Sequence, residues 1–147
     1  MPRINTLDAV MYRRVLDAVA SQASANTDWI QVFADANRAT FSLRFGAVGT
    51  SLAMKLTQAT SSGGANAKDI TNAAITTVLN AAEGTAMLVT IEIGPGALDT
   101  ANGFIWVRAE VVATGTCVWS VELELYDLRV LPPTQHASYA EAVRVYD

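Results

Sequence analysis

Alternation of apolar and polar side chains is the feature that most limits how this chain can fold. Between residues 105 and 125 the apolar positions are Ile105, Val107, Ala109 and Val111 and, after an ATGT turn, Cys117, Trp119, Val121, Leu123 and Leu125. Side chains on a β-strand point alternately to its two faces, so a period of two predicts strands with one buried face. The short turn between the two runs predicts a long β-hairpin.

The same alternation recurs in residues 40–45, 51–57 and 87–93, and turn-forming residues separate these segments. Residues 28–33 are also predicted as a strand, and residues 70–82 fit either period, with a strand preferred. The pattern slips near Asp127, which predicts a bulge or a strand end there. Roughly six to eight short strands separated by turns predict an all-β fold, namely an antiparallel β-sandwich or a jelly roll.

The two ends of the chain have a different character. Residues 6–20 place apolar side chains at helical spacing after Thr6, which predicts a short N-terminal helix or an ordered arm. Residues 134–147 carry aromatic and apolar side chains that have no obvious place in a core, which suggests a tail that lies on a partner. The expected organisation is an arm over residues 1–26, a β-sandwich over residues 27–131 and a tail over residues 132–147.

Composition excludes several classes of protein. Only 16% of the 147 residues are charged, against about 25% in ordinary soluble domains, so neighbours are expected to cover part of the surface. The net charge is −4 and no basic cluster is longer than Arg13–Arg14, which argues against binding to nucleic acid. No stretch approaches the ~20 apolar residues of a membrane span, and the first residues do not form a secretory signal. We expect synthesis in a host cytoplasm and no contact with a membrane.

A single cysteine and a single histidine restrict the chemistry of the chain. Cys117 cannot form an internal disulfide and is expected to be a small buried residue. His136 cannot form a histidine cluster and is expected on the surface of the tail. We predict no catalytic residue, no cofactor site and no metal site.

Two acidic patterns have the residue types of a possible site. Glu122 and Glu124 share one face of a strand, where they could serve acid–base chemistry or bind a cation, although a solvated strand face is the simpler interpretation. The segment GPGALDTANG lacks the order of a phosphate loop and is interpreted as a turn. Asp99 and Asn102 within it could hold Ca²⁺, but the spacing of an EF-hand is absent.

Aromatic side chains suggest a third kind of site. Trp29, Trp106 and Trp119 could form a platform for sugar rings if they shared one face. Trp119 has the phase of the buried face, and Trp106 has the opposite phase.

A tract of Ser, Gly, Ala and Asn follows the alternating strand in SLAMKLTQATSSGGANAKDIT, residues 51–71. Two interpretations are open for this tract. It is either a loop that becomes ordered against a neighbouring subunit or a larger shell, or a mobile loop in solvent.

The order of segments TDWIQVF, ATFSLRFGAVG, KLTQATSSGGANAKDI and LDTANGFIWVRAEV resembles a group of small virion proteins of tailed bacteriophages, over roughly residues 27–130. The resemblance implies a decoration (cement) protein without enzymatic activity, bound outside an icosahedral capsid and commonly trimeric. Its partners would be the major capsid protein and further copies of itself. The tail beyond Pro133 is not part of the pattern. The alternatives are a neck, tail or fibre-base component, and a carbohydrate-binding module or small enzyme.

On this interpretation, nine residues are assigned to a subunit or capsid interface. They come from the two chain ends and from the Ser/Gly/Ala/Asn tract: Met11, Tyr12, Val15, Ser61, Gly63, Asn66, Tyr139, Val143 and Tyr146.

Overall fold

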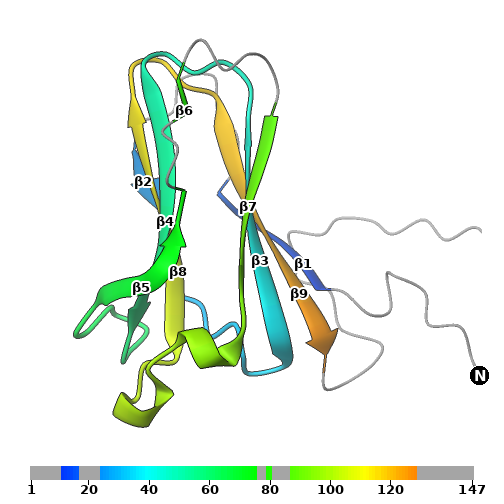
Figure 1. Cartoon of the computed structure of the whole chain (residues 1–147), viewed down its shortest axis with the longest axis vertical. Coiled ribbons are helices and arrows are strands. Elements are labelled where there is room, and N and C mark those ends of the chain that lie inside the picture. The colour runs from blue at the N-terminus through cyan, green and yellow to red at the C-terminus, as the bar shows by residue number, and fades with distance from the viewer. Residues whose placement is uncertain (1–10, 17–23, 76–78, 81–86, 129–147) are drawn as a thin grey trace, which may run out of the picture.

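A computed structural model of the chain describes residues 11–16, 24–75, 79–80 and 87–128. These residues form two antiparallel β-sheets that face each other across one hydrophobic core (Figure 1). The predicted all-β sandwich is therefore confirmed.

Four strands form the first sheet, called sheet A, and the remaining strands form sheet B. The strand order of sheet A is β1 (Met11–Leu16), β9 (Trp119–Leu128), β3 (Ala36–Phe45) and β7 (Met87–Ile93). The order of sheet B is β2 (Ala25–Asn26), β8 (Trp106–Thr114), β4 (Ser51–Ala59) and β5 (Lys68–Ala74), and the short β6 (Leu79–Asn80) also pairs with β4.

The core lies between the two sheets and is filled by the alternating side chains that the sequence pattern singled out. Phe41 and Leu43 of β3 and Leu123 of β9 are fully buried from the side of sheet A. Leu56 and Val107 are fully buried from the side of sheet B. The period-two pattern therefore identified the buried face of each of these strands correctly.

The predicted hairpin over residues 105–125 is wrong. Strand β8 belongs to sheet B and β9 to sheet A, so the chain between them crosses from one sheet to the other. Strands β3 and β4 are joined by a crossing of the same kind. Alternation shows which face of a strand is buried, and that face is the same whether the next strand lies beside it or across the core.

The two crossings, residues 46–50 and 115–118, pack against each other at one end of the sandwich, and we call them the arches. The Thr50 amide donates to the Thr114 carbonyl at 2.8 Å, and the Val118 amide donates to the Ala47 carbonyl at 2.9 Å. At Gly49 a Cβ atom would lie 2.4 Å from the backbone nitrogen of Thr116. Only glycine allows the two backbones to approach this closely.

The predicted N-terminal helix over residues 6–20 is wrong where the structure describes it. Residues 11–16 form β1, which pairs with β9 so that Met11 lies opposite Leu125. Without β1, this side of β9 would present unpaired backbone groups, and pairing with them outweighs the local helical spacing. Strands β1 and β2 both precede residue 27, so the sandwich begins earlier in the chain than expected.

Two other local predictions are corrected. Residues 28–33 do not form a strand, since they pair only at an isolated bridge between Ile30 and Val107 before the chain turns towards β3. At Asp127 the register between β9 and β3 continues through to Leu128. The predicted bulge is therefore absent, and the backbone at Asp127 is instead left-handed, with φ of 52°. The alternative prediction of a strand end agrees with β9, whose described part ends at Leu128.

Candidate interaction surfaces

Three connecting segments build the end of the sandwich opposite the arches, which we call the loop end. They are residues 31–35, residues 60–67 (the Ser/Gly turn) and residues 94–105 (Figure 1). The third segment contains two short 3-10 helices, η2 (Pro95–Ala97) and η3 (Thr100–Asn102). Gly103, with φ of 81°, ends η3 in a left-handed conformation that glycine adopts without strain.

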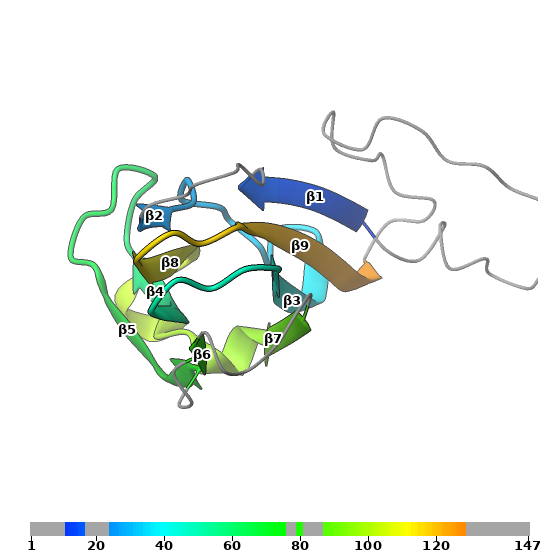
Figure 2. The same ribbon diagram turned by 90° about the horizontal axis from the view of Figure 1, so that it is seen from above.

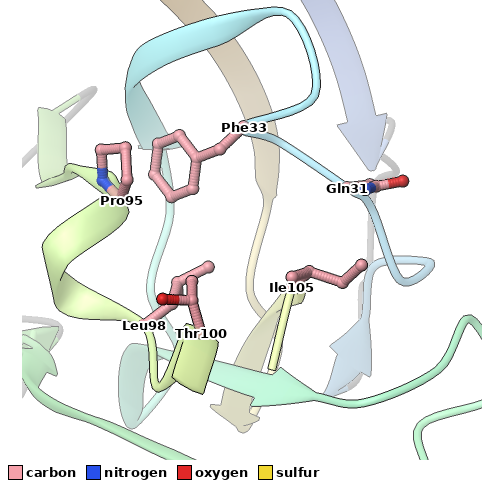
Figure 3. A pocket seen from close by; sticks show the side chains of 6 residues that line it. All are labelled: Gln31, Phe33, Pro95, Leu98, Thr100 and Ile105. Carbon is pink, nitrogen blue, oxygen red and sulfur yellow. The ribbon is translucent and has the colours of Figure 1, made fainter. Parts of the chain in front are cut away.

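A cavity of about 190 Å³ opens at the loop end (Figure 3). Its walls are mainly apolar, with an amide and a hydroxyl among them: Gln31, Phe33, Pro95, Leu98, Thr100 and Ile105. In Figure 3 the ring of Phe33 lies beside Pro95, and Ile105 lies across the cavity from them. Ile105 is 38% exposed. An exposed apolar wall beside a hollow is suited to bind an apolar group.

The segment that carries η2 and η3 is anchored to sheet B through Asp99. Lys68 of β5 donates to Asp99 Oδ2 at 2.6 Å, and the Asn102 side chain donates to both carboxylate oxygens. The Asp99 amide donates at 2.8 Å to Oε1 of Gln58, which is buried in β4. The Lys68 ammonium also lies 4.0 Å from the centre of the Phe104 ring. These contacts hold one wall of the cavity in place.

The Lys68–Asp99 contact predicts a pH dependence of stability. The hydrogen bond from Lys68, and after it the one from Asn102, lower the pKa of Asp99 below its ordinary value of 3.8. A carboxylate with a lowered pKa contributes stability above its unfolded-state pKa and loses it as pH falls through the folded-state value. We expect Asp99→Asn to lower the melting temperature at neutral pH, and this deficit to shrink as pH falls below about 4.

Thermal unfolding followed by circular dichroism across this pH range measures the effect. Asp35→Asn, an exposed carboxylate at the same end of the sandwich, is the control. A deficit for Asp99→Asn that stays constant from neutral to acid pH would contradict the assigned role of the carboxylate.

A second polar cluster lies on the outer face of sheet B around Arg108. Its guanidinium carbon lies 4.5 Å from the centre of the Trp29 ring, and this contact is a cation–π interaction. Its Nε and Nη2 donate to Glu110 Oε1 at 3.0 and 2.6 Å, and Thr57 of β4 donates to the same oxygen at 3.2 Å. The cluster therefore joins the segment before β3 to strands β8 and β4.

Lys55 extends this cluster to β5. Its ammonium lies 2.7 Å from Asp69 Oδ1 and 3.7 Å from Glu110 Oε2. The hydrogen bond to Asp69 is the largest cause of the raised pKa of Lys55, and desolvation opposes it. Lys55 therefore links the Arg108 cluster to β5 through its contacts with Glu110 and Asp69.

The Ser/Gly turn is ordered by contacts within the chain. The Ser61 hydroxyl accepts hydrogen bonds from the amides of Gly63 and Ala65 at 3.3 and 3.2 Å. A Cβ at Gly64 would lie 2.5 Å from Trp29 Nε1, so glycine allows the backbone to rest on the indole. The turn is thus ordered without the neighbouring subunit that the sequence hypothesis invoked, and a contact between the turn and a partner stays a prediction.

The three tryptophans do not form one platform. Trp119 is 1% exposed and faces the core. Trp29 lies against Arg108 and under Gly64, and Trp106 is half-buried in β8. A sugar ring could not stack on all three side chains.

The acidic patterns have structural partners. Arg44 donates to Glu122 at 2.9 Å and Tyr126 donates to Glu124, which fits a solvated strand face. Among the described residues no group of three or more Asp, Glu, His or Cys is placed to hold a metal ion. Cys117 is fully buried, as predicted. His136 lies outside the described residues.

The nine residues assigned to an interface fall into three groups. The first group lies on β1, at the edge of sheet A: Met11, Tyr12 and Val15. The second lies on the Ser/Gly turn beside sheet B, away from β1 (Figure 2): Ser61, Gly63 and Asn66. The third lies outside the described residues: Tyr139, Val143 and Tyr146. The structure thus does not bring the first two groups together.

The cavity and the Trp29–Arg108 contact were missed by the sequence analysis. The cavity is lined by short segments that meet only after folding, and none of them carries a motif. The Gly63–Gly64 pair was the one usable signal, because adjacent glycines often mark a close approach of backbone to another group.

No family model matches the chain, and no curated protein is significantly similar to it. Within the described residues, no helix has the length and apolar composition that a membrane span requires.

Proposed function

We propose that this protein is a structural component of a tailed-phage virion that binds the outer surface of the capsid and stabilises it as a decoration protein. The resemblance of residues 27–130 to small head-associated virion proteins suggests this role. The two-sheet sandwich supports it, because a decoration protein needs a stiff body that presents binding segments. The proposed partners are the major capsid protein and two further copies of the chain.

The main support for the proposal is that β1 begins close to the point where the described part of β9 ends. Strand β1 begins at Met11, which lies opposite Leu125 of β9, and the described part of β9 ends at Leu128. The segments before Met11 and after Leu128 therefore leave the sandwich at one corner of sheet A. Two segments that start at one corner can engage the same neighbour, and weak contacts repeated over many symmetric copies add up to strong binding.

The outer faces of the two sheets carry ion pairs, and this favours the packing of many copies of the protein side by side. On sheet A, Arg38 pairs with Glu92 and Arg44 pairs with Glu122. On sheet B, Lys55 and Arg108 both contact Glu110. The exposed pair of Arg38 and Glu92 contributes little to stability. Each of these pairs places opposite charges side by side, which limits repulsion between identical neighbours.

Binding to phage heads tests the proposal. We expect light scattering to give the mass of a trimer. Cosedimentation with undecorated tailed-phage heads should saturate at a fixed ratio of protein to capsid subunit. Binding at only a few copies per particle would indicate a neck or tail component instead, and a monomer that ignores heads would contradict the proposal.

Two truncations locate the binding segments without removing a strand. Deleting residues 1–10 or residues 134–147 leaves β1 and β9 intact, so we expect both variants to fold. We expect each to saturate heads only at higher protein concentration. If both bind heads like the full chain, the corner of sheet A is not the docking site.

A further inference from the structure

The cavity at the loop end has a shape and a lining that fit one aromatic side chain. Its volume is about 190 Å³, and an apolar cavity of ~150 Å³ is large enough for a benzene molecule. Phe33, Pro95, Leu98 and Ile105 supply apolar walls. Gln31 and Thr100 add groups that can form hydrogen bonds. An apolar ring with one hydroxyl, as in tyrosine, matches both parts of this lining.

The C-terminal segment starts close to this cavity. Leu128, the last described residue of β9, lies opposite Ala36 at the start of β3. On the other side of β3, β7 ends at Ile93 and leads through Gly94 to Pro95 in the cavity wall. Adjacent strands lie about 4.8 Å apart, so roughly 10 Å separates Leu128 from the cavity wall.

The length of chain beyond Leu128 is ample for this distance. An extended chain covers about 3.3 Å per residue, so residues 129–139 can span up to roughly 35 Å. Tyr139 is the first aromatic residue after Leu128, and Tyr146 is the next. Seating Tyr139 closes the shorter loop and therefore costs less chain entropy.

We propose that the cavity is a binding site for the chain's own C-terminal segment, with the ring of Tyr139 seated between Phe33 and Ile105. The segment would cover the exposed face of Ile105. This segment could fold back in this way whether or not the protein binds capsids, so the head-binding assay and this inference can fail independently.

Methyl NMR of the full chain tests the inference, because the ring current of a seated tyrosine displaces the resonances of nearby methyl groups. We expect deletion of residues 134–147 to shift the methyl resonances of Leu98 and Ile105. The methyl resonances of Val112, which is 55% exposed on β8, serve as the control and should stay unchanged.

Two point variants identify the seated residue within a full-length chain. Tyr139→Ala should reproduce the shifts at Leu98 and Ile105, and Tyr146→Ala should not. Unchanged Leu98 and Ile105 resonances after truncation would overturn the proposal. Shifts in the full chain that disappear on dilution would also overturn it, because they would show that a second copy supplies the segment.

Discussion

Replacing Leu123 with alanine is expected to lower the free energy of unfolding by roughly 2–5 kcal/mol. Leu123 is fully buried in β9 and lies opposite Phe41 of β3 at the centre of sheet A. The substitution removes apolar contacts and leaves a cavity that a two-sheet core cannot close easily, since strands on both sides fix the backbone. Urea denaturation of the parent and variant measures the difference.

Leu88→Ala is the matched control for this experiment. Leu88 lies in β7 of the same sheet and is 49% exposed. It loses the same atoms without opening a core cavity, and its expected cost is within about 0.5–1 kcal/mol. Similar losses at the two positions would mean that β7 and β9 do not present the faces described for them.

Gly49→Ala is expected to destabilise the protein by about 1–3 kcal/mol or more, although the new side chain is only a methyl group. Its Cβ would lie 2.4 Å from the Thr116 nitrogen and 2.8 Å from the Gly115 carbonyl carbon. These are backbone atoms, so the clash can be relieved only by moving the arches apart. That movement would lengthen the hydrogen bond between Thr50 and Thr114.

Gly46→Ala separates this effect from the general cost of replacing glycine. Gly46 belongs to the same arch, and no atom lies within 4 Å of the position that its Cβ would occupy. We expect this variant to unfold at the urea concentration of the parent or slightly above it, because alanine reduces the freedom of the unfolded chain. Equal destabilisation by the two variants would show that the arches are not in tight contact.

The sequence pattern predicted correctly which faces of the main strands are buried. It did not predict which strands lie next to each other. Residues 40–45, 51–57 and 107–125 bury the side chains that alternation selected, whereas Ile105 is exposed. The hairpin was wrong because a turn of four residues can return a strand to its own sheet or carry it to the opposite one. The crossing here is accompanied by the close contact of Gly49 with Thr116, and these residues are far apart in the sequence.

Interactions between distant residues also explain the other failures. The spacing of residues 6–20 favours a helix locally, but β9 offers residues 11–16 a row of backbone partners. The composition of the Ser/Gly turn gave no sign that Gly64 packs on Trp29. The cavity wall formed by Leu98 is positioned by Asp99 and Lys68. Neither periodicity nor composition contains information on such contacts.

The chain crossing between sheets has a consequence for how the protein is made. Strand β3 pairs with β9, and β4 pairs with β8, so each central pair joins an early segment to a late one. While residues 119–128 have not yet left the ribosome, the nascent chain lacks a central strand of sheet A. We therefore expect the core to close only after synthesis of β9, and folding to be slow, as is usual when distant segments must meet. Until then the edge of β3 is open to other chains, so crowded synthesis of many copies favours aggregation unless folding is assisted.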